Sequence, residues 1–222
     1  MSAEPLAIDV GEGLRVSALL DAPPDALAVF VFAHGAGAGM SHSFMAALAA
    51  GLAARDIATL RYQFPYMERG SRRVDPPALA HATVRAAVAK AASRLPGLPL
   101  YAGGKSFGGR MTSQAQAGSA LPGVGGIVFV GFPLHPAGKP STERADHLAQ
   151  VGVRMLFLQG TRDELADLAL LQGTIGGLGK RATLEVFEHA DHSFHVPARS
   201  GRTDAQVREA LLDAMERWMV AG

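Results

Sequence analysis

One serine, with a glycine two positions away on either side, is the residue best suited to chemistry in this chain. Ser106 stands in the segment LPLYAGGKSFGGRM, between Gly104 and Gly108. An apolar run precedes it and a helix-compatible run follows, which predicts a strand, a very tight turn and a helix with Ser106 at the apex. The flanking glycines are required because the backbone passes too close there for a Cβ. Such a turn exposes the hydroxyl beside the positive end of the new helix, where it can act as a nucleophile.

Three other interpretations of glycine-rich turns in this chain compete with that one. A phosphate-binding loop, GxxxxGK[ST], requires glycine where Pro99 stands. A dinucleotide fingerprint in HGAGAG requires glycine or alanine where Met40 or His42 stands, so both frames fail. A turn without chemistry is the remaining alternative for Ser106, and the presence of partner residues downstream decides between the two.

Two further polar residues follow predicted strands in an order that suits a serine nucleophile. The run VRMLFLQG leads into Asp163, and ATLEVF leads into His192. Ligands of mostly parallel sheets bind at the carboxyl ends of the strands, so we expect both side chains to lie near Ser106. The order Ser, Asp, His is that of hydrolases in which a serine, a histidine and an acid act together. Asp163 could instead cap a helix, and His189 and His195 compete with His192 as the base or as part of a metal site, although we expect no metal.

A glycine-rich turn near the N-terminus supplies the fourth part of this chemistry. HGAGAG follows the apolar run 26–33. Acyl transfer needs two N–H donors for the developing oxyanion, one from the residue after the nucleophile and one from a loop after an early strand. We therefore expect Phe107 to supply the first donor and Ala36 the second, with Gly37 as the alternative.

Strands and helices alternate along the whole chain. Short alternating runs at 6–10 and 14–20 predict an antiparallel hairpin at a sheet edge. Further strands are predicted at 26–33, 57–62, 98–102, 124–130, 153–158 and 182–187, and helices at 43–55, 76–94, 142–150, 165–171 and from a capping box at Thr203 and Gln206. This order predicts an α/β fold with a mostly parallel central sheet covered by helices on both faces. No linker or repeat divides it, so we expect a single domain over residues 1–222.

Composition narrows the classes of function. The chain has 222 residues, 21 basic and 20 acidic side chains and a net charge of +1, which favours neither nucleic acid nor an anionic membrane as partner. It has no cysteine, which excludes disulfides, thiolate metal sites and a cysteine nucleophile. The N-terminus lacks the pattern of a secretory signal, and the uncharged stretch 26–54 is too interrupted to span a bilayer. These features favour a cytoplasmic protein.

Several motifs together resemble those of a known family. The segments HGAGAGMSHSFM, RYQFPYMERG, GGKSFGGRM, GFPLHPAGKP, LQGTRDE and ADHSFHV are spread over nearly the whole chain. They resemble α/β-hydrolases of the dienelactone-hydrolase-like group, and more closely the branch of the testis-expressed and NSL-complex-subunit-type proteins. The resemblance implies the α/β-hydrolase fold, Ser106 as nucleophile, Asp163 as acid, His192 as base and no cofactor. The namesake enzymes use a cysteine, which this chain lacks, and some relatives are subunits of complexes.

The predicted activity is hydrolysis of an ester or related acyl bond in a small-molecule substrate. A non-catalytic scaffold that binds a partner is the alternative. The sequence does not identify the substrate, does not distinguish a hydrolase from an acyltransferase, and does not give the oligomeric state. Only some twenty residues separate the strands 124–130 and 153–158, which predicts a pocket without a large lid.

The charged residues near the pocket are expected to have structural roles. Arg69, Arg72 and Arg73 are expected in a solvated loop, and Lys105 and Arg110 in structural salt bridges. The residues expected to line the pocket are His34, Gly35, Gly37, Phe64, Phe132 and Leu134.

Overall fold

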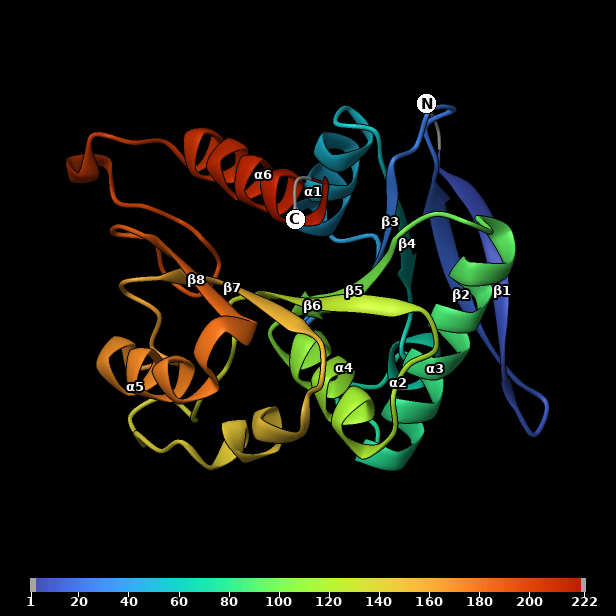
Figure 1. Ribbon diagram of the computed structural model, residues 1–222, viewed down its shortest axis with the longest axis horizontal. Helices are drawn as coiled ribbons and strands as arrows, with labels where there is room; N and C mark the ends of the chain where they lie inside the picture. The colour runs from blue at the N-terminus through green and yellow to red at the C-terminus, as the bar shows by residue number, and fades with distance from the viewer. Residues whose placement is uncertain (1–2, 221–222) are drawn as a thin grey trace.

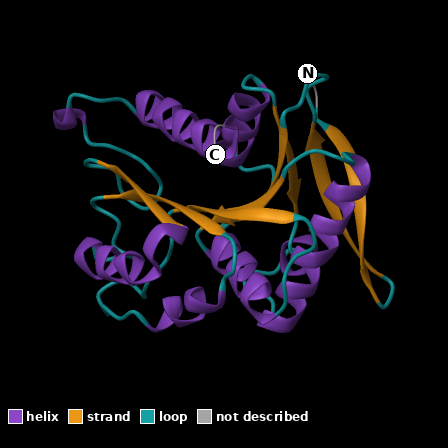
Figure 2. Ribbon diagram, viewed as in Figure 1, coloured by secondary structure: helices purple, strands orange, loops and turns teal. Residues whose placement is uncertain are grey.

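A twisted eight-stranded sheet forms the centre of the molecule in the computed structural model, which describes residues 3–220 (Figures 1 and 2). The strand order is β1-β2-β4-β3-β5-β6-β7-β8. The antiparallel hairpin of β1 and β2 pairs antiparallel with β4, and the pairs from β4 through β8 are parallel. The strands are β1 (Glu4–Gly11), β2 (Leu14–Asp21), β3 (Ala28–Ala33), β4 (Ile57–Tyr62), β5 (Leu100–Lys105), β6 (Val124–Val130), β7 (Arg154–Gly160) and β8 (Ala182–Phe187).

Helices cover both faces of this sheet. In Figure 1, α1 and α6 lie above it and α3, α4 and α5 below. The strand side chains alternate accordingly: Phe30 and Phe32 of β3 pack in the core formed with α1 and α6, while Val29 and Val31 pack in the core on the other side. The helices are α1 (Ser43–Ala53), α2 (Pro65–Glu68), α3 (Pro77–Arg94), α4 (Phe107–Gly118), α5 (Leu168–Leu178) and α6 (Asp204–Val220).

The predicted fold class is confirmed, and the strand predictions at 57–62, 124–130 and 182–187 match the structure residue for residue. The ends of most other elements are shifted by one to three residues, and three larger details differ. The short helix expected at 142–150 is the 3₁₀-helix η1 (Glu143–Gln150), and the helix expected at 165–171 is α5, which begins at its N-cap Asp167 and runs to Leu178. The short helix α2 was not predicted, because a Pro-containing segment of four residues carries no helical periodicity.

Among residues 3–220, no large lid covers the carboxyl ends of the parallel strands. The segment between β6 and β7 contains only a loop and η1. Within residues 3–220, none of the helices combines the length and the apolar character needed to cross a bilayer.

Candidate active site

Ser106 occupies a strained turn between β5 and α4. Its backbone has a φ of 50°, in the left-handed region that side chains other than glycine rarely adopt. A Cβ on Gly104 would stand 2.5 Å from the carbonyl oxygen of Ala33, and one on Gly108 would stand 2.6 Å from that of His34. Both flanking glycines are therefore required by contact with the β3 backbone, as the sequence predicts.

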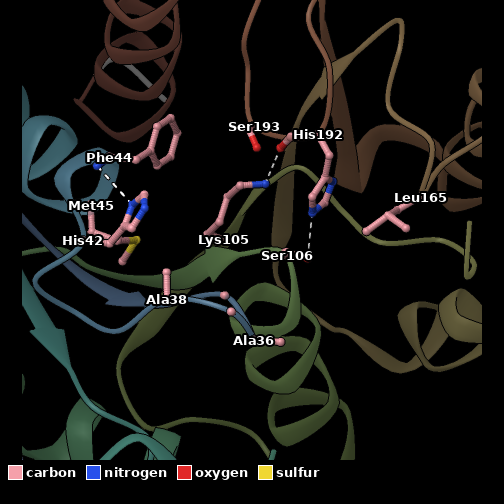
Figure 3. A pocket seen from close by; sticks show the side chains of 12 residues that line it. Ala36, Ala38, His42, Phe44, Met45, Lys105, Ser106, Leu165, His192 and Ser193 are labelled. Atoms are coloured by element: carbon pink, nitrogen blue, oxygen red, sulfur yellow. Dashed lines mark hydrogen bonds between the residues drawn. The ribbon is translucent and has the colours of Figure 1, made fainter. Parts of the chain in front are cut away.

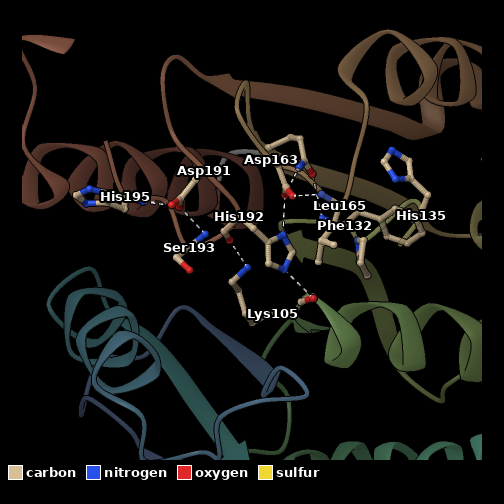
Figure 4. A network of polar contacts seen from close by, with 12 residues as sticks. Lys105, Phe132, His135, Asp163, Leu165, Asp191, His192, Ser193 and His195 are labelled. Carbon is tan, nitrogen blue, oxygen red and sulfur yellow. Dashed lines mark hydrogen bonds and ion pairs between the residues drawn. The ribbon is translucent and has the colours of Figure 1, made fainter. Parts of the chain in front are cut away.

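Ser106, His192 and Asp163 form one continuous chain of hydrogen bonds, of which Figure 3 shows the bond between Ser106 and His192 and Figure 4 the bond between His192 and Asp163. The Oγ atom of Ser106 lies 2.8 Å from Nε2 of His192, and Nδ1 of His192 lies 2.7 Å from Oδ2 of Asp163. An ionised carboxylate only accepts hydrogen bonds, so Nδ1 carries the ring proton and donates it to Asp163. Nε2 is then free to accept the hydrogen of the Ser106 hydroxyl. The three predicted side chains are brought together by the ends of three neighbouring or near-neighbouring strands, β5, β7 and β8.

The carboxylate of Asp163 is fully buried and is held from three sides. Besides His192, it accepts hydrogen bonds from the amide of Gln159 on β7 and from the backbone N–H of Leu165. Burial by itself would raise the pKa of Asp163, but the hydrogen bond and charge of His192, the Leu165 N–H and the charge of Lys105 together hold the pKa below its ordinary value. Asp163 therefore remains ionised beside the imidazole at neutral pH.

The other two histidines of the same loop lie elsewhere. His195 pairs with Asp204 at 2.8 Å, and this exposed contact raises the pKa of His195. His189 is exposed and its backbone N–H is bonded to the Thr161 hydroxyl. Within residues 3–220, no group of three or more His, Asp or Glu side chains could hold a metal ion.

Two buried side chains hold the loop after β3 in place: His34, which belongs to the loop, and Tyr66. The backbone N–H of Phe64 donates to Nε2 of His34, so His34 donates from Nδ1 to the Gly35 carbonyl at 2.8 Å. Burial lowers the pKa of His34, which keeps the ring neutral. The Tyr66 hydroxyl lies 3.2 Å from the Gly35 carbonyl oxygen and 3.0 Å from that of Ala36. The backbone of this loop is therefore fixed beside Ser106.

A pocket of about 470 Å³ opens at Ser106 (Figure 3). One wall comes from the loop after β3 and from α1, and the opposite wall from His192, Ser193 and Leu165. Apolar groups dominate the lining, among them Ala38, Phe44, Met45 and Leu165. Ala36 and Gly37 are exposed and the His192 side chain keeps 24% of its surface accessible, so the pocket is open to solvent.

The sequence model of the family described as alpha/beta hydrolase domain matches residues 26–220. The chain belongs to this family. Solved structures agree on the fold of this alpha/beta hydrolase. A dienelactone hydrolase from Anabaena variabilis superposes with a TM-score of 0.77 at 19% identity, covering 97% of this chain and 98% of that chain.

Two further structural neighbours carry names of the same kind. XC6422 from Xanthomonas campestris, described as a serine hydrolase without lid, superposes with a TM-score of 0.74 at 21% identity and covers 100% of this chain and 97% of that chain. Est1E from Butyrivibrio proteoclasticus superposes with a TM-score of 0.68 at 17% identity and covers 97% and 99%. At these identities the likeness concerns the fold.

Four of the six residues expected to line the pocket of this hydrolase lie beneath it instead. His34, Phe64, Phe132 and Leu134 are completely buried. Phe64 packs edge-on against Phe107, and Phe132 packs against Phe129 and Phe157. Only Gly35 and Gly37 of that set line the pocket. The expectation failed because a residue directly after a buried strand continues into the core when its side chain is aromatic or aliphatic.

The expectation for Lys105 and Arg110 is also wrong. Neither side chain forms an ion pair with an acidic residue among residues 3–220. Lys105 extends along the pocket and donates from Nζ to the carbonyl oxygen of His192. Arg110 leaves its Nε atom buried with no hydrogen-bond partner in the described part of the chain. The turn therefore presents both Ser106 and Lys105 to the pocket.

The basic loop 63–75 leaves the pocket uncovered. No residue of this loop lines it. Arg69 pairs with the buried carboxylate of Asp75 at 2.7 Å, while Arg72 and Arg73 are exposed. These placements agree with the interpretation of a solvated basic loop.

Proposed function

We propose that this alpha/beta hydrolase is a serine esterase that cleaves accessible carboxylic esters through Ser106, His192 and Asp163. The observation that carries the proposal is the unbroken hydrogen-bond chain from the buried Asp163 carboxylate to the Ser106 hydroxyl at the edge of an open pocket. The names of the structural neighbours, which include a dienelactone hydrolase and a serine hydrolase without lid, support the same reaction class. The narrower resemblance to the testis-expressed and NSL-type branch is part of the proposal.

The reaction proceeds in two halves. His192 removes the proton of Ser106 as Oγ forms a bond to the carbonyl carbon of the ester, and Asp163 holds the imidazolium that results. His192 then gives this proton to the alcohol oxygen as the carbon–oxygen bond breaks and the alcohol leaves. In the second half, water loses a proton to His192 and attacks the acyl-enzyme, which releases the acid and restores Ser106.

The oxyanion of each tetrahedral intermediate requires two N–H donors. Phe107 is the first residue of α4, whose first-turn N–H groups have no helical acceptor. In a trans peptide, the C=O and the following N–H point in opposite directions. Because the carbonyls of Gly35 and Ala36 face Tyr66, the N–H groups of Ala36 and Gly37 face away from it. We assign Phe107 and Ala36 as the donors, with Gly37 as the alternative.

Removal of the Tyr66 hydroxyl tests this assignment. In Tyr66→Phe, the ring still fills its buried site while the hydrogen bonds to the Gly35 and Ala36 carbonyls are lost. We expect kcat for a p-nitrophenyl ester to fall about 10-fold to 100-fold with little change in KM. The oxyanion donors act only in the transition state, so their misalignment lowers kcat and leaves substrate binding unchanged. Tyr101→Phe, which removes a buried hydroxyl far from Ser106 that bonds to the Met219 carbonyl, is the matched control and should leave kcat unchanged. An equal kcat in Tyr66→Phe and wild type would show that the Tyr66 hydroxyl does not position this loop for catalysis.

Labelling with a fluorophosphonate probe tests the proposed function itself. The probe phosphonylates only an activated serine that is accessible to solvent, so we expect a stoichiometric adduct on the peptide that contains Ser106. His192→Ala should label far more slowly, because no base then removes the hydroxyl proton. An absence of adduct on folded wild-type protein would overturn the esterase assignment and favour the use of the fold as a binding scaffold.

A further inference from the structure

Among the described residues that line the pocket, Lys105 is the one lysine or arginine. The other lining residues are small, apolar or neutral polar, apart from the histidines His42 and His192. None of the described residues in this lining is an aspartate or a glutamate. Figure 3 shows the Lys105 side chain running along the pocket from the turn at Ser106 toward the loop that carries His192 and Ser193. A cation is therefore built into the wall beside the nucleophile.

The Lys105 ammonium has hydrogen-bonding capacity left over. An ammonium group has three N–H donors, and Nζ uses one of them on the His192 carbonyl oxygen. Two other close neighbours of Nζ are Gly131 and the ring of Phe194, whose centre lies 5.6 Å away and which accepts no conventional hydrogen bond. Within the described part of the chain, no carboxylate lies within ion-pair distance of Nζ.

The carboxylates nearest to Lys105 are already committed to other donors. Asp163 accepts from His192, Gln159 and Leu165. Asp191 accepts from the backbone N–H groups of Ser193 and His195, as Figure 4 shows. Burial lowers the pKa of Lys105 to about 8, against the opposing charges of Asp163 and Asp191. Lys105 is half-buried, and a half-buried ammonium without a direct counter-ion gains more from an incoming anion than an exposed one does.

We propose that Lys105 makes the pocket selective for esters that carry a carboxylate, such as half-esters of short dicarboxylic acids. The proposal rests on the esterase function proposed above. Water and the half-ester give the dicarboxylic acid and the alcohol by the two-step reaction through Ser106, and the carboxylate of the substrate takes no part in bond making. The apolar wall formed by Ala38, Phe44 and Met45 fits the short hydrocarbon that joins the two functional groups.

The hydrogen bond to His192 gives Lys105 a second effect that an experiment must separate from selectivity. Loss of this bond loosens the loop that carries the catalytic base, and this slows every substrate by the same factor. Loss of substrate recognition slows only the anionic ester. The ratio of kcat/KM for an anionic ester to that for a neutral ester of equal length therefore reports recognition alone.

The test compares two pairs of esters on wild-type protein and variants. The first pair places the carboxylate on the acyl side: mono-p-nitrophenyl glutarate against p-nitrophenyl pentanoate. The second places it on the alcohol side: 3-carboxyphenyl butanoate against phenyl butanoate. We expect the anionic member of one pair to be preferred by about 10-fold to 100-fold in wild type, and this pair identifies the side that faces Lys105.

The variants are Lys105→Met, which keeps the length of the side chain without its charge, Lys105→Arg, and the control Lys180→Met at an exposed position after α5. The preference should fall to about 1 in Lys105→Met and persist in Lys105→Arg and Lys180→Met. A ratio near 1 in wild type, or a preference that survives in Lys105→Met, would overturn the proposal while leaving the esterase function intact. Failure of all four esters together with absent fluorophosphonate labelling would overturn both.

The pH dependence of the wild-type ratio gives a test that does not depend on any variant folding. kcat/KM reports ionisations of the free enzyme. The charged form of Lys105 predominates below its pKa of about 8, so the preference should be full near pH 7 and decline as the pH rises through 8. Any ionisation that alters the catalytic machinery itself affects both esters of a pair and cancels in the ratio. A ratio that stays constant from pH 6.5 to about 9.5 would contradict the proposal.

Discussion

Replacement of Ser106 by alanine is expected to lower kcat for p-nitrophenyl butanoate by about 10⁵-fold or more. The change removes the atom that forms the acyl-enzyme, and residual activity then comes only from binding and from the oxyanion donors. The Cβ of alanine fits the turn, because the strained φ of 50° is already occupied by a residue with a Cβ. The fold should therefore persist, and the loss should appear in kcat rather than in KM.

The control variant for this prediction comes from the far end of the helix that follows Ser106. Ser119→Ala changes an exposed serine at the C-terminal end of α4 and should leave kcat unchanged. Circular dichroism and the unfolding midpoint in urea establish that Ser106→Ala is folded. If folded Ser106→Ala retained more than about one hundredth of wild-type kcat, another group would be the nucleophile.

The strands and the three residues of the hydrogen-bond chain were predictable because each depends on a local pattern. A fully apolar run such as 124–130 specifies a buried parallel strand, and the carboxyl end of such a strand fixes where Asp163 and His192 must lie. Gly104 and Gly108 were predictable for a different reason: close contact with the β3 backbone leaves no room for any other residue. The catalytic roles of Ser106, Asp163 and His192 stay predictions, which the kinetic experiments on the variants test.

The pocket lining was not predictable, because it depends on which way each side chain turns after its strand ends. Phe132 and Leu134 turn into the core, while Phe44 and Met45 of α1 line the pocket from a helix that carries no chemical motif. The sequence predicts a structural salt bridge for Lys105, and only the three-dimensional contacts show that its ammonium instead meets the Phe194 ring and the His192 carbonyl. Gln159 did leave a signal, since it is the one polar side chain in the run MLFLQG, and buried polar groups require partners.

Replacement of Asp163 by asparagine is the second prediction with a very large effect, and we expect kcat to fall about 10⁴-fold. Asparagine fills the same volume but offers an NH₂ group or a neutral oxygen where the carboxylate accepted from His192. The backbone N–H of Leu165 donates to Oδ1, so the new side chain turns its oxygen to Leu165, and its NH₂ group then takes the place of Oδ2 and faces Nδ1 of His192. The imidazole then holds its proton on Nε2, which faces Ser106 and can no longer accept the hydroxyl hydrogen.

The pH dependence of stability gives a second test of the ionised Asp163 carboxylate. Because the pKa of Asp163 lies below its ordinary value, the carboxylate stabilises the folded protein above that ordinary value, and the contribution is lost only as the pH falls through the lowered pKa. Asp163→Asn should therefore unfold at lower urea concentration than wild type at pH 7, and the difference between the two unfolding midpoints should narrow toward pH 3.

Asp167→Asn, which keeps a good N-cap for α5, is the matched control and should change neither kcat nor stability by much. A folded Asp163→Asn protein with kcat within tenfold of wild type would show that His192 works without its acid, and the assignment of Asp163 would then be wrong.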